Sequence, residues 1–158
     1  MTPDAMVRLM RAALAAARTG IVRGGGPFGA VVADAGGAIV ATAVNVVLVT
    51  NDPTAHAEVQ AIRAATARRR DRSLRDCTLV TTCAPCVMCT GAIHWAGVGH
   101  VVAGARRDDA EAIGFVEGPA AFDASAFLAA RGIAYAPDVE RDAAVALLRA
   151  YQGPIYNP

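Results

Sequence analysis

A chain of 158 residues, 54% hydrophobic and 18% charged, is long enough to bury a core as one domain, and this composition excludes general disorder. The formal net charge of +1 gives no reason to expect a protein that wraps nucleic acid, and no segment approaches the roughly 20 apolar residues of a membrane span. All 15 basic residues are arginine, so Schiff-base chemistry and a phosphate-loop lysine are excluded.

Helix and strand signals alternate along the chain after an opening hairpin. Thr2 and Pro3 predict the first helix start, because a hydroxyl cap precedes proline at the first helical position. The expected elements are a helix to about residue 20, strands over 28–34 and 38–47, a helix over 55–69, a strand over 78–82, a helix over 85–97, a strand over 98–103, a helix over 125–130, a strand over 133–135 and a helix over 138–151. This order predicts a single α/β domain over residues 1–158, with a mixed sheet of about five strands covered on both faces.

The cysteines indicate metal binding in a reducing compartment. Three of the four, Cys83, Cys86 and Cys89, lie within seven positions, too close for the disulfide framework of a small secreted protein. Asp4 stands where a signal peptide carries positive charge, and Arg11 interrupts the apolar run. We therefore expect a cytoplasmic protein.

Two short motifs thirty positions apart predict a metal site. His56-Ala57-Glu58 offers an imidazole and a carboxylate, and Pro85-Cys86-Val87-Met88-Cys89 offers two thiols. Zinc prefers nitrogen and sulfur ligands, and three protein ligands leave the fourth tetrahedral position for water, as in catalytic sites. The two thiols share a helix face in a first turn, where the helix dipole favours thiolate. His56 and Glu58 converge on one ion only if it lies off the N-terminal end of their helix.

Glu58 has no local ion pair at helical spacing, so it is placed to move the proton of a water held at the metal. The alternative is a solvated glutamate beside a core histidine, with the two cysteines packed as small hydrophobic residues. Cys83 also has ligand spacing relative to Cys86, but it should lie at a strand end, which favours a buried free thiol.

His-x-Glu followed by Pro-Cys-x-x-Cys is the signature of zinc-dependent base deaminases. The chain resembles the cytidine-deaminase-like superfamily, and its motifs are most similar to the bacterial guanine deaminase branch. Three stretches carry the resemblance: 25–31, 51–59 and 83–95. The resemblance implies a three-layer α/β/α fold, one zinc ion per subunit and hydrolysis of guanine to xanthine and ammonia. It assigns the zinc to His56, Cys86 and Cys89 and the proton shuttle to Glu58.

The resemblance also implies a substrate site. Asn45 would hydrogen-bond the base edge, Phe28 and Trp95 would stack on the ring, and the Ala57 backbone would contact a carbonyl group. Asp109 would accept hydrogen bonds from the 2-amino and ring N–H groups of guanine. A flat heterocycle suits aromatic faces, and a donor edge suits a carboxylate. Each residue has a plainer alternative: a turn for Asn45, core packing for both aromatic residues and a helix cap for Asp109.

By the same resemblance, the C-terminal helix and tail, 138–158, could be exchanged between the subunits of a homodimer, with Tyr156 as a lid over the pocket. The alternative is a frayed tail. The chain departs from the branch at two places. Ala84 stands where glutamate is usual before Pro-Cys, and the run 116–119 after Phe115 does not follow the usual pattern.

Several rival functions remain open. The same chemistry could act on cytosine, a nucleoside, a triazine or adenosine in tRNA, the last through the arginine cluster of 68–75. A solvated helix C-terminus, where arginines suit the helix dipole, is the favoured explanation of these residues, so nucleic acid is not expected as a partner. A non-catalytic zinc module would need a fourth ligand such as Cys83, and a redox Cys-x-x-Cys protein would not need His56 or Glu58.

Overall fold

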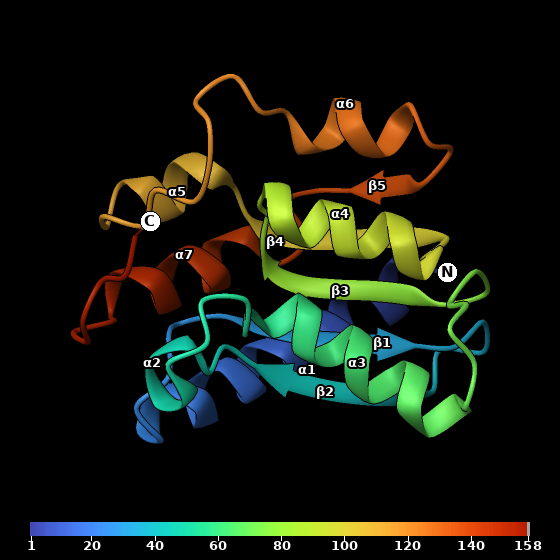
Figure 1. Cartoon of the computed structure of the whole chain (residues 1–158), viewed down its shortest axis with the longest axis horizontal. Coiled ribbons are helices and arrows are strands. Elements are labelled where there is room, and N and C mark those ends of the chain that lie inside the picture. The colour runs from blue at the N-terminus through green and yellow to red at the C-terminus, as the bar shows by residue number, and fades with distance from the viewer. Residues whose placement is uncertain (158) are drawn as a thin grey trace.

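Residues 1–157 are described by a computed structural model (Figure 1). The elements are α1 (Pro3–Val22), β1 (Gly29–Ala33), β2 (Ile39–Val44), α2 (Val47–Thr50), α3 (Ala57–Arg69), β3 (Thr78–Cys83), α4 (Val87–Ala96), β4 (His100–Ala105), α5 (Arg107–Glu111), α6 (Ala124–Ala129), β5 (Ala134–Ala136) and α7 (Arg141–Arg149). Within this part of the chain, no helix combines the length and the apolar character needed to cross a membrane.

The strands form one mixed sheet of five strands in the order β2-β1-β3-β4-β5. Strand β1 is antiparallel to both of its neighbours, β2 and β3, whereas β3, β4 and β5 run parallel. Every residue of β1 and β3 is buried, as expected for central strands covered on both faces. The predicted mixed, five-stranded sheet is therefore confirmed.

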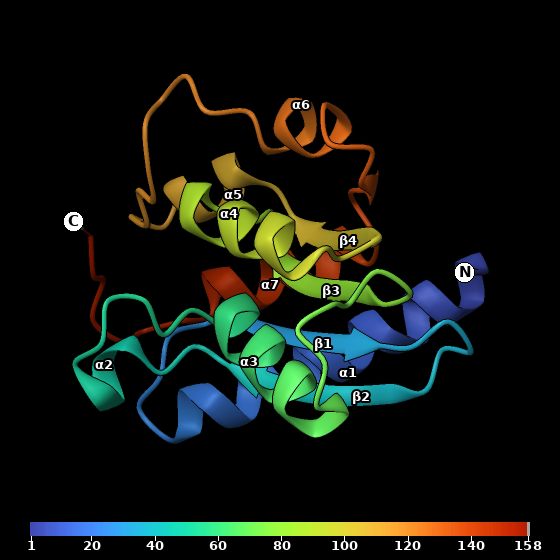
Figure 2. The same cartoon turned by 45° about the vertical axis from the view of Figure 1, so that its right-hand side comes forward.

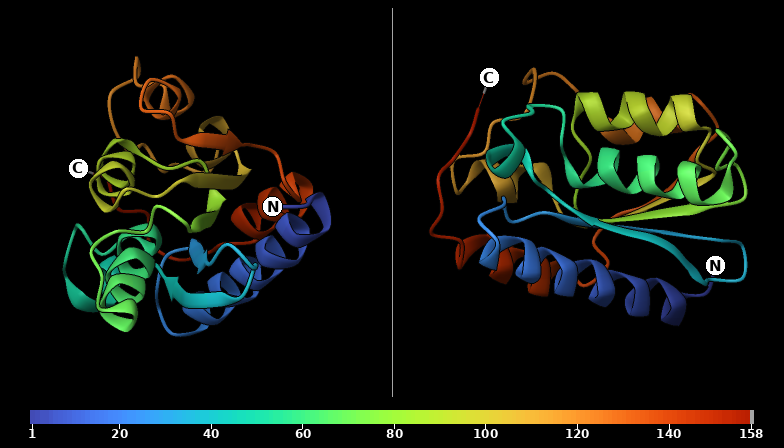
Figure 3. Two further views of the ribbon diagram at one scale, coloured as in Figure 1. Left: turned by 90° about the vertical axis from the view of Figure 1, so that its right-hand side faces the viewer. Right: turned by 60° about the horizontal axis from the view of Figure 1, so that its bottom comes forward.

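Helices cover both faces of the sheet. Helices α1 and α7 lie on one face, and α3, α4 and α6 lie on the other (Figures 2 and 3). The buried stripe of α1 recurs at helical spacing, which explains why this helix packs on β1 and β3: Leu9, Met10, Ala13, Leu14 and Ala17. The expected three-layer α/β/α architecture is confirmed.

Local signals set most helix ends. The Thr2 hydroxyl accepts a hydrogen bond from the Ala5 N–H at 3.3 Å, which caps α1 as predicted. Gly97 adopts a left-handed conformation with φ 67° and ends α4. Helix α4 begins at Val87, so Cys86 is its N-cap and Cys89 lies in its first turn.

Two boundaries and two short helices, α2 and α5, differ from the sequence prediction. The strand expected to reach residue 47 ends at Val44, because the Asn45 side chain accepts a hydrogen bond from the Val47 N–H at 3.2 Å and starts the short helix α2. The last helix starts later than predicted, because Asp138 and Glu140 adopt left-handed backbone conformations. Helix α5 was not predicted.

The topology brings two helix starts to one end of the sheet. Strand β3 ends at Cys83, and the chain turns directly into α4. Helices α3 and α4 pack side by side on the same face, and both begin at the end where β3 finishes (Figure 3). Ligand sites in α/β sheets commonly lie at the carboxyl ends of parallel strands, and the histidine and cysteine motifs meet at this edge.

Candidate metal centre and pocket

The side chains of His56, Cys86 and Cys89 form a compact cluster whose ligand atoms all lie within 4.8 Å of one another. The Nδ1 atom of His56 lies 3.6 Å from the sulfur of each cysteine. Zinc bonds of about 2.3 Å to sulfur and about 2.05 Å to nitrogen, at a tetrahedral angle, would place these atoms about 3.6 Å apart. The donor set and its spacing therefore fit a zinc ion.

Both motifs supply their ligands from helix starts. His56 is the N-cap of α3 and Cys86 is the N-cap of α4, and neither side chain caps its own helix. The two side chains are thus free to face a common centre. A hydrogen bond from Cys89, helped by His56 and a backbone N–H, lowers the pKa of Cys86 to about 4 despite burial. This sulfur is a thiolate at neutral pH, the form that binds a metal.

Glu58 lies beside the cluster in the first turn of α3 and is only 6% exposed. Its Oε1 accepts a hydrogen bond of 3.1 Å from the Thr81 hydroxyl of β3. Burial raises the pKa of this carboxyl group. A buried carboxylate with a raised pKa, held by one hydrogen bond next to a metal site, is suited to accept and return a proton.

Cys83 does not join the cluster. It is the last residue of β3, its thiol faces the backbone carbonyl of Arg106 at 3.6 Å, and burial raises its pKa well above the ordinary value. The sulfur of Cys83 lies outside the group of ligand atoms formed by His56, Cys86 and Cys89. The arrangement supports a three-ligand site that leaves a coordination position open.

Glu117 is the residue that sequence reasoning missed. Its Oε1 lies 3.8 Å from Nε2 of His56, and this oxygen is buried without a hydrogen-bond partner among residues 1–157. Burial raises the pKa of Glu117 to about 7. The only sequence signal was that residues 116–119 depart from the family pattern. A buried carboxylate oxygen with no partner is costly, so its presence at the metal centre points to a ligand group that donates hydrogen bonds.

A cavity of about 250 Å³ opens on the metal centre between α2, α4 and the C-terminal tail. Its wall includes His56, Cys86, Glu117 and Tyr156. A flat bicyclic base is of a size that such a cavity can hold, and the polar groups converge on its inner end.

The tail reaches the pocket of its own chain. The Tyr156 ring packs edge-on to Phe115 at 5.0 Å and to His56 at 6.2 Å, and its hydroxyl is hydrogen-bonded to the Asn45 amide. Asn45 is fully buried, and its Oδ1 is held by the Val47 N–H. The structure therefore brings Asn45 and Tyr156 together at the metal centre.

Phe28 and Ala57 lie near the site but inside the core. The ring of Phe28 packs edge-on to Phe115 at 5.0 Å, and it does not line the cavity on the metal centre. Ala57 is fully buried between His56 and Glu58 at the start of α3, where helical N–H groups lack intrahelical partners. A backbone contact to substrate from this position stays a prediction.

Two expected substrate residues are not in the pocket of this chain. Trp95 is 87% exposed near the C-terminal end of α4, whereas the metal ligands lie at the other end of that helix. Asp109 closes a capping box with the Arg106 backbone at 2.8 Å and forms an ion pair with Arg141 at 2.7 Å. Both carboxylate oxygens of Asp109 are thus used within the protein, as its plainer alternative predicted.

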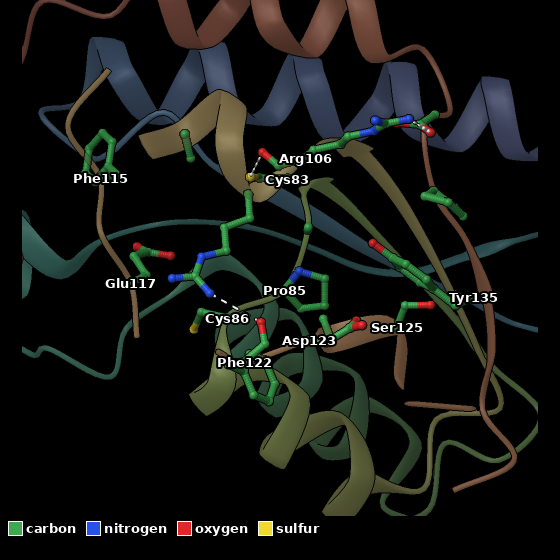
Figure 4. Close-up of a pocket in the computed structure, with 16 residues that line it drawn as sticks. Cys83, Pro85, Cys86, Arg106, Phe115, Glu117, Phe122, Asp123, Ser125 and Tyr135 are labelled. Carbon is green, nitrogen blue, oxygen red and sulfur yellow. Dashed lines mark hydrogen bonds and ion pairs between the residues drawn. The ribbon is translucent and has the colours of Figure 1, made fainter. Parts of the chain in front are cut away.

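A second cavity of about 390 Å³ adjoins the first and shares Cys86 and Glu117 with it. It extends between β5 and the segment before α6. Figure 4 shows Glu117 and Cys86 toward one end of this cavity and Ser125 and Tyr135 toward the other. Ala84 lines it, so the alanine at this unusual position borders open space rather than packed side chains.

Comparisons with known proteins agree with this geometry. A family model described as the cytidine and deoxycytidylate deaminase zinc-binding region matches residues 4–105. Guanine deaminase of Bacillus subtilis is 52% identical over 91 residues, which span 58% of this chain and 58% of that protein.

Two solved structures are similar over most of the chain. A guanine deaminase from Nitrosomonas europaea has a TM-score of 0.87 and 41% identity, covering 92% of this chain and 83% of that chain. A variant of the protein NE0047 in complex with 8-azaguanine has a TM-score of 0.88 and 41% identity, covering 92% and 84% of the respective chains.

Proposed function

This chain belongs to the cytidine and deoxycytidylate deaminase zinc-binding family, and from that premise we propose that it is a zinc-dependent hydrolytic deaminase that converts guanine to xanthine and ammonia. One observation carries the proposal. The buried Glu58 and the half-buried Glu117 lie beside a His-Cys-Cys cluster, and His56, Cys86 and Glu117 line a base-sized cavity. The similarity to guanine deaminases and to a protein in complex with 8-azaguanine supports the choice of base.

His56, Cys86 and Cys89 would hold one zinc ion per chain. When bound, zinc supplies Lewis acidity that lowers the pKa of water to about 7. The start of α4 stabilises the thiolate of Cys86, and the position of Cys83 outside the cluster supports an open site rather than a closed structural one.

Glu58 moves the protons. Its carboxylate accepts a proton from the attacking water as the water oxygen bonds to C2 of guanine, and it delivers that proton to ring N3. It then transfers the remaining hydroxyl proton to the 2-amino nitrogen, the C2–N bond breaks, ammonia leaves, and C2 retains the oxygen as the carbonyl group of xanthine. The hydrogen bond from Thr81 holds one oxygen of Glu58, which leaves the other free for this transfer.

Glu117 would recognise the base. Guanine presents its ring N1–H and 2-amino groups as adjacent donors, and Oε1 of Glu117, which has no hydrogen-bond partner among residues 1–157, is an acceptor beside the metal centre. Cytosine and adenine lack this pair of donors. Asn45 has a second amide hydrogen beyond the one bound to Tyr156, and it could serve the acceptor edge of the base.

An ammonia-release assay tests the proposed substrate directly. Zinc-loaded protein is incubated with guanine, guanosine, cytosine, adenine, ammeline or tRNA, and ammonia is measured. We expect release from guanine, with conversion to xanthine. Release from another compound alone, or from none of them, would overturn the assignment to guanine.

The arginine cluster does not favour a tRNA substrate. It lies at the C-terminal end of α3, whereas His56 caps the N-terminal end, so the two are about 20 Å apart along a 13-residue helix. Arg69 in that cluster is already paired with Asp76 at 3.0 Å. Tight tRNA binding with a steep salt dependence would contradict this interpretation.

A homodimer in a reducing compartment is part of the proposal. Val87 and Trp95 lie on one side of α4 and are 42% and 87% exposed, an apolar surface that a second copy could cover. The free thiols of all four cysteines suit the cytoplasm: Cys77, Cys83, Cys86 and Cys89. If the 138–158 segment is exchanged, Tyr156 would make the same contacts with the other subunit that it makes here within one chain. Light scattering of the intact chain and of a chain ending at Gly153 would test both the dimer and the role of the tail in it.

A further inference from the structure

The segment that carries Glu117 has little structure of its own. Residues 115–123 connect α5 to α6 without helix or strand. Within the described residues, its backbone makes one internal hydrogen bond, from Phe122 N–H to the Pro119 carbonyl at 3.0 Å, one to α5, from Phe115 N–H to the Ala110 carbonyl at 3.1 Å, and one to α6, from Phe127 N–H to the Asp123 carbonyl at 3.0 Å. Among residues 1–157 the Oε1 of Glu117 has no hydrogen-bond partner, and it lies 3.8 Å from Nε2 of His56, so hydrogen bonds of this oxygen do not hold the carboxylate in place. Other groups must hold the segment in place.

Arg107 holds the C-terminal part of this segment. Its Nη1 donates to the backbone carbonyl of Pro119 at 2.8 Å and more weakly to those of Phe122 at 3.3 Å and Ala120 at 3.4 Å. Its Nη2 donates to the carbonyl of Gly118 at 3.3 Å. The Nε atom is bound to Glu111 at 2.6 Å, one turn along α5, which fixes the plane of the guanidinium.

Asn157 holds the N-terminal part of the same segment. Its side-chain oxygen accepts a hydrogen bond from the Val116 N–H at 2.8 Å, and its amide donates to the Gly114 carbonyl at 2.9 Å. The residue before it, Tyr156, packs on Phe115. One tail thus closes the pocket with its tyrosine and clamps the backbone on the N-terminal side of Glu117 with its asparagine.

We propose that Arg107 and Asn157 are positioning residues that hold the Glu117 carboxylate at the metal centre by fixing its backbone from both sides. The proposal rests on the proposed function, in which Glu117 binds the base. Arg107 acts through the backbone, because its ion pair is with Glu111 and its other partners are carbonyl groups. It therefore leaves the negative charge of Glu117 available for substrate donors.

Arg107→Ala tests the first anchor. Misplacing a group that contacts the reacting part of a substrate by about 1 Å can cost on the order of 100-fold in rate, so we expect kcat/KM for guanine to fall by about 10- to 100-fold with zinc content unchanged. Arg107→Lys should recover only part of the loss, because an ammonium group lacks the planar fork that reaches several carbonyl groups. Arg8→Ala is the matched control, since Arg8 donates to the Gly37 carbonyl in the distant β1–β2 hairpin, and it should leave kcat/KM unchanged.

A double-mutant cycle separates positioning from a general loss of stability. If Arg107 acts through Glu117, then Arg107→Ala should cost less than about twofold when added to Glu117→Gln, although it is costly in the wild type. If Glu117→Gln turns over too slowly, the affinity for 8-azaguanine is measured in the same four proteins. Equal costs of Arg107→Ala in both backgrounds would overturn the proposal.

Asn157→Ala tests the second anchor. Amide hydrogen exchange at Val116 should become faster, and kcat/KM should fall by about 3- to 30-fold. Asn157→Asp should show a smaller loss, because its oxygen still accepts from the Val116 N–H but it does not donate to Gly114. Gln152→Ala, an exposed position in the same tail, is the control. Unchanged exchange at Val116 in Asn157→Ala would refute the clamp.

The two proposals fail in different ways. A zinc-loaded wild type that releases no ammonia from guanine refutes the proposed function, whereas hydrogen exchange still reports whether the anchors order residues 115–123. An active wild type in which the Arg107 and Asn157 variants keep full kcat/KM refutes only the positioning role.

Discussion

On one side of the pocket, all three metal ligands come from the starts of two packed helices, α3 and α4; on the other side, Glu117 and Tyr156 come from an irregular segment and the chain's tail. The first side is held by short-range geometry, because Cys86 and Cys89 are three residues apart on one helical turn. The second side also depends on contacts between residues 41 to 111 positions apart, such as those of Asn157 with Val116 and of Tyr156 with Asn45. The metal side is therefore rigid by construction, and the substrate side depends on assembly of the whole fold.

This difference has a physical consequence for function. Helix starts packed on a sheet unfold only with the domain, whereas segments with few backbone hydrogen bonds open at lower free energy. We expect substitutions on the metal side to abolish chemistry outright. Substitutions on the substrate side should instead give graded losses and altered substrate choice.

The largest effect is expected when a metal ligand is removed. Cys86→Ser removes a thiolate ligand, so the purified protein should lose most of its zinc and its deaminase activity should fall below detection. Cys83→Ser is the matched control, three positions earlier, and it should keep the full zinc content by metal analysis. Zinc loss in Cys83→Ser would instead favour a closed structural site with four protein ligands.

Glu58→Gln should separate metal binding from chemistry. The amide cannot carry the proton, so kcat should fall by about 10²- to 10⁴-fold while zinc content stays at the wild-type level. Glu140→Gln, which alters a surface ion pair with Arg11, is the control and should leave kcat unchanged. Full activity in Glu58→Gln would remove the proton-shuttle role.

Glu117→Gln should give the largest effect on the substrate side. Replacing one carboxylate oxygen by an amide group removes an acceptor for the guanine donors, and we expect kcat/KM for guanine to fall by about 100-fold. Zinc content should not change, because the ligand cluster does not include this residue. Steady-state kinetics on guanine together with zinc analysis would sharpen the comparison: a loss with full zinc content indicates recognition, and a loss that accompanies loss of zinc indicates damage to the metal centre.

Tyr156→Phe should give the smallest effect. It removes one hydrogen bond, to Asn45, and keeps the ring that packs on Phe115. A single neutral hydrogen bond contributes about 0.5–1.5 kcal/mol, so KM for guanine should rise by about 2- to 10-fold with little change in kcat. A chain ending at Gly153 should lose more activity, because it lacks both the Tyr156 ring and the contacts of Asn157. Identical kinetics for the truncated and intact chains would eliminate a role for the tail.

The sequence predicted the metal side well for a reason visible in these residues. Spacing, the proline before Cys86 and the turn before His56 are local signals, and local signals specify helix starts. Local signals do not decide the role of Asp109, which was expected at the substrate by resemblance: an aspartate at the third position of a short helix serves equally well as a cap or as a ligand, and only the fold shows that Arg141 binds its second oxygen.

Glu117 was missed for the opposite reason. Nothing adjacent to it in sequence indicates burial, because it lies between an exposed valine and a glycine. Its environment is made by His56 and Tyr156, which are far away along the chain. Asn45 and Tyr156 were expected only by resemblance, and their mutual contact could not be derived from spacing.

The exposed position of Trp95 gives the protein a built-in optical reporter. It is the only tryptophan in the chain, and the residue is 87% exposed on α4, away from the metal ligands. Its fluorescence emission should therefore be unaffected by zinc or substrate binding, but it should shift to shorter wavelength when another protein surface covers that helix. Dilution of unlabelled protein in a fluorimeter would thus follow self-association without any dye or engineered label.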